Sequence, residues 1–143
     1  MSAVVHTHRL QVRYGETDQM GVVYHANYLT WFEVGRTEFL RHSGLTYREL
    51  EEKGVLLPVA EATLRYKLPA RYDDWVEIRT RIEELTPVRL TFAYEVYRIP
   101  DETLLVSGKT MHAFTTPTMK PIRLSRAEPD VYAWLLAQYE GGA

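Results

Sequence analysis

Residues 14–39 read YGETDQMGVVYHANYLTWFEVGRTEF, and this stretch decides the fold. Its first part, 15–21, lacks apolar periodicity and combines glycine with polar residues, which is typical of a loop. Its second part repeats large or small apolar residues at helical spacing, at Tyr28, Phe32, Gly35 and Phe39. The pattern therefore predicts a loop followed by a long amphipathic helix over about residues 24–42, with Leu29 and Leu40 widening its apolar stripe.

Local signals refine this helix. Asn27 or His25 is a candidate cap at its start, and Gly44 suits its end because glycine tolerates the left-handed conformation there. A glycine inside a helix costs roughly 1 kcal/mol relative to alanine. Gly35 therefore predicts a packing reason, such as close approach to a sheet.

Outside this segment the chain is mainly strand. Alternating apolar and polar residues predict strands at 8–14, 59–67, 75–83, 88–96 and 103–115, with short helical segments at 46–53 and 128–139. Consecutive strands grouped after one helix indicate an α+β protein with an antiparallel sheet. A sheet curled around the long helix would bury the apolar stripe, which is the hotdog fold. No linker or repeat interrupts residues 1–143, so we expect a single domain.

The composition excludes several functions. The chain has no cysteine, so a thiolate nucleophile, a disulfide and a cysteine-bound zinc are excluded. A net charge of -2 gives no electrostatic reason to expect nucleic acid as the main partner. No apolar run approaches the ~18 residues of a membrane span, and the first residues do not resemble a signal peptide. We therefore expect a cytoplasmic protein.

The Thr17-Asp18 pair, followed by Gly21 and then by Tyr-His-Ala-Asn-Tyr over residues 24–28, is a long and unusual string. It resembles the signature of the 4-hydroxybenzoyl-CoA thioesterase family, including its Tol-Pal-associated acyl-CoA thioesterase branch. The Lys120-Pro121 turn and the strand order extend the resemblance less specifically. The resemblance implies a hotdog fold, an acyl-CoA substrate, no cofactor, and a homodimer, often a homotetramer, with active sites at the dimer interface.

Asp18 is the central catalytic candidate. Thioester hydrolysis needs an attack on the carbonyl carbon and donors for the developing oxyanion. Asp18 would act as general base towards water, or attack directly to form a mixed anhydride. The resemblance places the oxyanion hole at backbone amides near Tyr24 or His25, where a helix start has unpaired N–H groups. Without the surrounding string, Asp18 would read as a turn cap, as aspartate commonly is.

Other residues are candidates for binding substrate, each with a structural alternative. The His25 side chain would contact the thioester or orient water, or would only end the loop. Tyr14 would line the acyl pocket or sit in the core, and Asn27 is most simply a helix cap. The cationic side chains that suit the phosphates of coenzyme A, or alternatively form solvated strand faces, are Arg65, Lys67, Arg89 and Lys120.

The remaining charged and imidazole groups have simpler interpretations. Glu33 lies on the helix, where another hotdog branch carries its catalytic carboxylate, but an ion pair with Arg36 is the preferred reading. His6 and His8 lack a third metal ligand nearby, so we expect no metal site. His112 alternates with apolar residues and is expected in a core or an interface.

Three other activities compete with hydrolysis of an acyl-CoA. A hotdog hydratase or dehydratase would use His25 with Asp18 or Glu33 as an acid–base pair. A non-catalytic module would bind acyl-CoA without turnover, since a fold alone does not guarantee activity. A serine hydrolase is disfavoured because no Gly-x-Ser-x-Gly elbow is present.

Overall fold

The computed structural model describes residues 3–140. Five strands form one antiparallel sheet in the order β1-β3-β4-β5-β2. The strands are β1 (Val5–Gln11), β2 (Val59–Tyr66), β3 (Trp75–Thr86), β4 (Arg89–Ile99) and β5 (Thr103–Ala113). The helices are α1 (Asn27–Ser43), α2 (Tyr47–Glu52), α3 (Leu124–Ala127) and α4 (Pro129–Tyr139), and a 3-10 turn, η1, spans Tyr14–Glu16.

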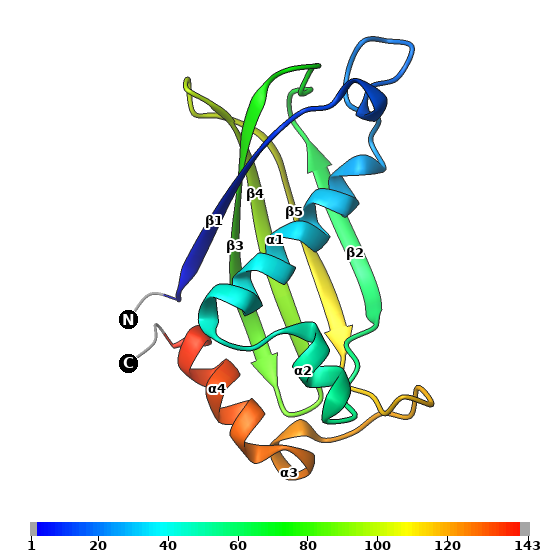
Figure 1. The fold of residues 1–143 in the computed structure, drawn as a ribbon, viewed down its shortest axis with the longest axis vertical. Helices are drawn as coiled ribbons and strands as arrows, with labels where there is room; N and C mark the ends of the chain where they lie inside the picture. Colours follow the sequence, from blue (N-terminus) through cyan, green and yellow to red (C-terminus); the bar gives the residue numbers. More distant parts are fainter. Residues whose placement is uncertain (1–2, 141–143) are drawn as a thin grey trace.

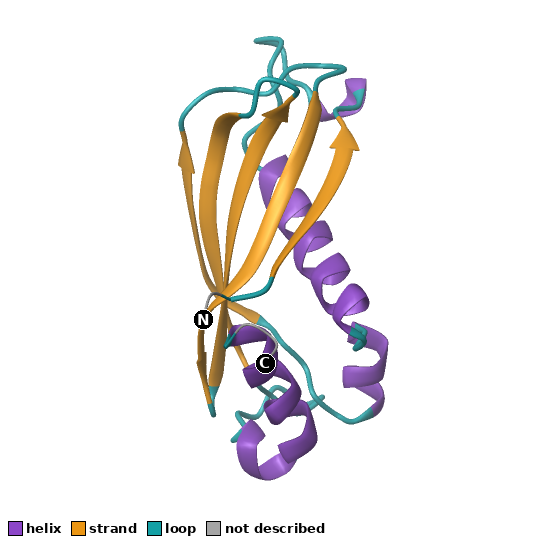
Figure 2. Cartoon of the chain, turned by 90° about the vertical axis from the view of Figure 1, so that its left-hand side faces the viewer, coloured by secondary structure: helices purple, strands orange, loops and turns teal. Residues whose placement is uncertain are grey.

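The long helix α1 lies along one face of the sheet, as Figures 1 and 2 show. The short helices α3 and α4 lie at the end of the sheet away from the η1 loop (Figure 1). This arrangement confirms the predicted α+β hotdog fold. Among residues 3–140, no helix is long and apolar enough to cross a membrane.

The core lies between α1 and the sheet. Alternate residues of β3 and β4 point towards α1 and are fully buried, as the strand patterns predict: Val76, Ile78, Thr80, Ile82, Leu90, Phe92, Tyr94 and Val96. From α1, the ring of Phe32 stacks on that of Tyr94, with centroids 4.2 Å apart and planes 4° apart. Each such large side chain removed from water stabilises the fold by roughly 1.5–3 kcal/mol.

Gly35 has the packing reason that the sequence predicts. A Cβ atom at this position would lie 2.5 Å from Oγ1 of Thr80 and 2.9 Å from Cγ2 of Ile78. Only a residue without a side chain lets α1 approach β3 so closely. Gly44, with φ of 103°, ends α1 in the left-handed conformation, as expected.

Several predicted boundaries and faces are wrong. β1 ends at Gln11 rather than 14, because the chain turns into η1 and the carboxylate of Glu16 accepts the Arg13 amide hydrogen. α1 begins at Asn27 rather than 24. Leu29 points to solvent and is 41% exposed, whereas Trp31, which the stripe omitted, is buried.

The edge strand β2 also departs from expectation. Its alternation predicts one buried face, but in the single chain only Leu64 is even half-buried. Within residues 3–140, β2 pairs with β5 alone, so its other edge carries no strand from this part of the chain.

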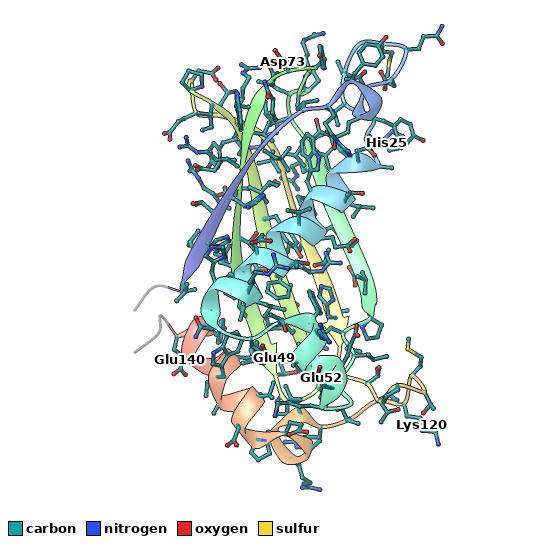
Figure 3. All side chains as sticks on the ribbon, viewed as in Figure 1. His25, Glu49, Glu52, Asp73, Lys120 and Glu140 are labelled. Atoms are coloured by element: carbon teal, nitrogen blue, oxygen red, sulfur yellow. The ribbon has the colours of Figure 1, made fainter. Side chains whose placement is uncertain are left out.

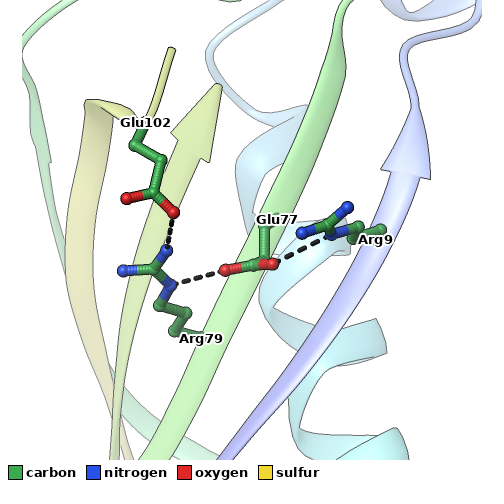
Figure 4. Close-up of polar contacts among 4 residues, drawn as sticks. All are labelled: Arg9, Glu77, Arg79 and Glu102. Carbon is green, nitrogen blue, oxygen red and sulfur yellow. Dashed lines mark hydrogen bonds and ion pairs between the residues drawn. The ribbon is translucent and has the colours of Figure 1, made fainter. Parts of the chain in front are cut away.

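The outer face of the sheet is covered by charged residues rather than by a helix. Glu77 on β3 accepts a hydrogen bond from Nε of Arg9 at 3.0 Å and another from Nε of Arg79 at 2.6 Å. Arg79 also contacts Glu102 at 3.3 Å (Figure 4). The two flanking guanidinium groups allow Glu77 to be only 7% exposed while keeping its charge.

Candidate active site

The loop that carries Asp18 folds back on itself before α1. The Asp18 amide donates to the Val22 carbonyl oxygen at 2.8 Å, and the Gly21 amide donates to that of Asp18 at 3.0 Å. Gly21 has φ of 81°, which a side chain would disfavour. The Met20 amide donates to Oδ1 of Asp18 at 2.9 Å. One carboxylate oxygen therefore stabilises the turn, while Oδ2 accepts no hydrogen bond from residues 3–140.

Asp18 also lines a hollow of about 230 Å³ between this loop, the start of α1 and the end of β2. Its polar lining is limited to Asp18, His25, Lys67 and the hydroxyl-bearing rings of Tyr28 and Tyr66. The rest is apolar: Met20, Val22, Val23, Leu68 and Pro69. An apolar hollow with a few polar groups is the usual form of a small-molecule site. Asp18 is thus both a turn residue and a pocket residue.

The backbone amides at the start of α1 are not equivalent. The Tyr24 amide donates to the Glu16 carbonyl oxygen, and the Asn27 amide donates to that of Tyr24, both at 2.9 Å. The amides of His25 and Ala26 have no acceptor within the described chain. Of the two expected oxyanion donors, Tyr24 is therefore engaged in the fold and His25 is free. The Tyr24 ring lies 4.4 Å from that of His25, but Tyr24 does not line the hollow.

His25 lines the hollow and lies just before α1 (Figure 3). Its imidazole is exposed, and its carbonyl oxygen accepts a hydrogen bond from the Tyr66 hydroxyl at 3.1 Å. Both readings of His25 are therefore compatible with its position, because it ends the loop and also faces the pocket.

The four candidate phosphate-binding residues do not converge in the single chain. Lys67 lines the Asp18 hollow, whereas Arg65 lies on the outer face of the sheet. Arg89 pairs with Glu84 at 3.0 Å. Lys120 lies at the opposite end of the molecule from His25 (Figure 3). Only Lys67 is placed to contact a substrate that reaches Asp18 of the same chain.

Two other expectations, for Tyr14 and Asn27, need correction. Tyr14 lines neither pocket nor core: it is 76% exposed and meets Tyr72 edge to face. Asn27 does not cap α1, whose N-cap is Ala26 without a side-chain hydrogen bond. Nδ2 of Asn27 instead donates to the Glu16 carbonyl oxygen at 2.8 Å.

The pair of Glu33 with Arg36 does not form. Arg36 turns inward and donates from Nε to the Tyr47 hydroxyl at 3.1 Å, while Glu33 stays exposed. Glu33 lines no part of the Asp18 hollow.

The other four histidines do not line the Asp18 hollow. His6 and His42 stack with ring centroids 4.3 Å apart, and no metal-binding cluster of three or more residues occurs within residues 3–140. His112 is fully buried, as the alternation predicts for a core position.

Some residues that line the hollow carry no signal in the sequence. Tyr66, Leu68 and Pro69 come from the end of β2 and the segment after it, some 40 residues beyond the motif. The helical spacing predicts Tyr28 as part of the apolar stripe of α1, but its ring also lines the hollow. Its hydroxyl accepts the Ala70 amide hydrogen at 3.2 Å, which holds this segment against α1. Pro69 marks the end of a strand in the sequence. No local pattern shows that the chain at this point lies beside the Asp18 loop.

Comparison with known proteins agrees with this arrangement. A family model described as the thioesterase-like superfamily matches residues 12–135. The acyl-CoA thioester hydrolase YbgC of Escherichia coli is 35% identical over 119 residues, which cover 82% of this chain and 88% of YbgC. The structure of a DHNA-CoA thioesterase from Staphylococcus aureus is 34% identical, with a TM-score of 0.86 over 91% of this chain and 87% of that one. A Thermus thermophilus protein of solved structure, TT1821, is 39% identical, with a TM-score of 0.84 over 92% of this chain and 98% of that one.

Proposed function

This chain belongs to the thioesterase-like superfamily, and from that premise we propose that it hydrolyses an acyl-CoA thioester to the free acid and coenzyme A. One observation carries the proposal. Asp18 and His25 border the same apolar hollow, and the amide of His25, two residues before α1, has no acceptor within residues 3–140. A thioester bound between them would have an oxyanion donor on one side and a base or nucleophile on the other.

The residues would divide the reaction as follows. The thioester oxygen accepts a hydrogen bond from the His25 amide, which lies where the helix dipole favours negative charge. Oδ1 of Asp18 stays bonded to Met20, so Oδ2 acts on the substrate. In the general-base route, Oδ2 takes a proton from water, the hydroxide oxygen bonds to the carbonyl carbon, and the carbon–sulfur bond breaks. The proton held by Asp18 then passes to the leaving thiolate.

In the nucleophilic route, Oδ2 itself bonds to the carbonyl carbon and expels the thiolate of coenzyme A. The resulting mixed anhydride is then cleaved by water, which regenerates the carboxylate. A single turnover in ¹⁸O-labelled water tests for the covalent route. Label in Asp18 shows that an anhydride forms and is hydrolysed at the aspartyl carbonyl, whereas the base route, like attack of water on the acyl carbonyl of the anhydride, places the label in the product acid.

The activity is tested with a panel of short, long and aromatic acyl-CoAs, following release of free thiol. We expect at least one to be hydrolysed, with turnover falling roughly 100-fold or more in Asp18→Asn. Asp130→Asn, an exposed aspartate in the first turn of α4, is the matched control and should keep full activity. An Asp18→Asn enzyme as fast as wild type would remove the proposed mechanism.

The same assay judges the alternatives. A hydratase or dehydratase would interconvert enoyl- and hydroxyacyl-CoA without releasing thiol. A binding module would show a rise in melting temperature with acyl-CoA but no turnover across the panel. Neither alternative has a specific observation in its favour here.

We further propose the finer assignments that the loop string suggests. These are membership of the Tol-Pal-associated branch, a cytoplasmic location, and a homodimer or homotetramer. The open edge of β2, beside the hollow, supports assembly of the site between subunits. Arg65, Arg89 and Lys120, which do not reach the hollow of their own chain, would then be candidates to contact coenzyme A from a neighbouring subunit. Light scattering checks the assembly.

A further inference from the structure

Glu16 is a buried carboxylate next to the catalytic loop, and it has no role in the reaction proposed above. It is 7% exposed. Its two oxygens accept from different elements: Oε1 from the Arg13 amide and Oε2 from the indole Nε1 of Trp31, each at 2.8 Å. The side chain therefore ties the end of β1 to the interior of α1. The exposed Arg13 guanidinium, 3.7 Å from Oε1, adds little because water screens it.

The backbone of the same residue holds the start of the helix. Its carbonyl oxygen accepts the Tyr24 amide hydrogen at 2.9 Å and Nδ2 of Asn27 at 2.8 Å. The oxygen atoms of this one residue thus accept four hydrogen bonds. They hold the chain next to the two groups that the reaction needs, because Asp18 follows Glu16 by two residues and His25 lies between Tyr24 and Asn27.

We propose that Glu16 is a positioning residue, which sets the distance between the Asp18 carboxylate and the His25 amide. This inference rests on the proposed thioester hydrolysis. It assigns Glu16 no contact with substrate. A displacement of about 1 Å in a reacting group can cost roughly 100-fold in rate. The hydrogen bonds that Glu16 accepts should therefore affect turnover more than substrate binding.

Glutamine tests the carboxylate with almost no change in volume. A glutamine has one side-chain oxygen, so either the Arg13 amide or the Trp31 indole would face an NH₂ group instead of an acceptor. We expect Glu16→Gln to lower kcat at least tenfold and to change KM less than threefold. Glu51→Gln, an exposed glutamate on α2, is the matched control and should change neither.

Asn27→Asp tests the hydrogen bonding of the Glu16 backbone carbonyl oxygen. It is also a second variant should Glu16→Gln fold poorly. The aspartate has the same shape but places an oxygen where Nδ2 now donates to the Glu16 carbonyl oxygen. We expect the same pattern of reduced kcat with little change in KM.

A double-mutant cycle separates positioning from a purely structural role. If Glu16 acts through Asp18, then Glu16→Gln costs less than threefold in an Asp18→Asn background. A residue that only supports the fold would lower the rate by the same factor in both backgrounds, and that result would overturn the inference. Unchanged kcat in Glu16→Gln would overturn it equally.

Hydrogen exchange gives a readout that does not depend on turnover. The Tyr24 amide, protected by the Glu16 carbonyl oxygen, should exchange at least tenfold faster in Glu16→Gln and at the wild-type rate in Glu51→Gln. If wild type hydrolysed no acyl-CoA, the proposed function would fail and exchange alone would decide whether Glu16 orders the loop. Unchanged exchange would show that it does not.

Discussion

The hydroxyl of Tyr66, at the end of the edge strand β2, donates a 3.1 Å hydrogen bond to the carbonyl oxygen of His25 at the start of α1. This bond joins two segments that are 41 residues apart in the chain. It acts on the peptide unit that follows His25, so it constrains the same turn that presents the His25 amide. The ring of Tyr66 also lines the hollow and meets that of Tyr28 edge to face, with centroids 5.6 Å apart.

Tyr66→Phe should therefore affect turnover more than stability. The substitution keeps the ring and removes one partly exposed neutral hydrogen bond, worth about 0.5–1.5 kcal/mol. We expect kcat for the best acyl-CoA to fall about 3- to 10-fold, while the free energy of unfolding falls by no more than about 1.5 kcal/mol. Tyr72→Phe, at an exposed tyrosine outside the hollow, is the control. Wild-type kcat in Tyr66→Phe would show that the bond is incidental.

Gly35→Ala should destabilise the protein although alanine is the better helix former. The added methyl group would lie 2.5 Å from Oγ1 of Thr80, in a part of the core where both elements are fixed by large buried side chains. Overpacking of this kind costs about 1–3 kcal/mol. Thr30→Ala, at an exposed position of α1, should be neutral or slightly stabilising. Urea unfolding of both variants checks this, and a gain in stability for Gly35→Ala would contradict the close approach of α1 to β3.

The sequence predicted the fold well because each main element carries a local signal. Gly35, Phe32 and Phe39 mark the face of α1 that packs on the sheet, and the alternation in β3 marks the facing residues. Boundaries were predicted less well where a side chain decides them. The end of β1 depends on the carboxylate of Glu16, which accepts the amide hydrogen of Arg13 three residues earlier. No periodic pattern in the sequence reveals this contact.

The site was only partly predictable for a different reason. Asp18 and His25 lie within one contiguous string, so the motif identifies them. Tyr66 and Leu68, which no motif identifies, reach the hollow because β2 pairs with β5, and that pairing depends on tertiary structure. The availability of the His25 amide rather than that of Tyr24 depends on which one meets the Glu16 carbonyl oxygen, and no sequence pattern encodes that choice.

Glu77 should stabilise the fold at neutral pH and lose this contribution in acid. Burial acts to raise the pKa of Glu77, but the hydrogen bonds and charges of Arg79 and Arg9 outweigh it and hold the pKa below its usual value. Because the pKa is lower in the folded state, this contribution is present above the unfolded pKa of about 4.3 and is lost as pH falls through the folded pKa.

We expect Glu77→Gln to cost about 1–2 kcal/mol at pH 7 and clearly less near pH 3, measured by urea unfolding at both pH values. Glu84→Gln breaks an exposed pair with Arg89 and is the matched control, with an expected change below about 0.5 kcal/mol. Equal costs for the two variants at pH 7 would mean that the ion pairs of Glu77 in Figure 4 stabilise the fold no more than an ordinary surface pair.

His112 lies in a buried polar chain that runs through the core. Its Nδ1 lies 2.9 Å from the Leu57 carbonyl oxygen, which can only accept, so Nδ1 carries the hydrogen. Nε2 then accepts from the Thr110 hydroxyl at 2.8 Å. Thr110 in turn accepts from the Tyr94 hydroxyl. Every donor in this chain has an acceptor only while His112 is neutral.

Protonation of His112 should therefore destabilise the fold. Burial lowers the pKa of His112 to about 4, and the nearby Arg36 charge acts in the same direction, against the opposing hydrogen bond to Leu57. Between pH 6.5 and 4 the unfolded histidine binds a proton that the folded one does not, so the free energy of unfolding falls as pH falls, by about 1.4 kcal/mol per pH unit. Urea unfolding from pH 4.5 to 6.5 should show this slope in wild type and lose most of it in His112→Asn, although that variant is less stable at pH 7. Parallel slopes for the two proteins would mean that His112 takes up a proton inside the fold, and the direction of hydrogen bonding assigned to the Tyr94–Thr110–His112 chain would then be wrong.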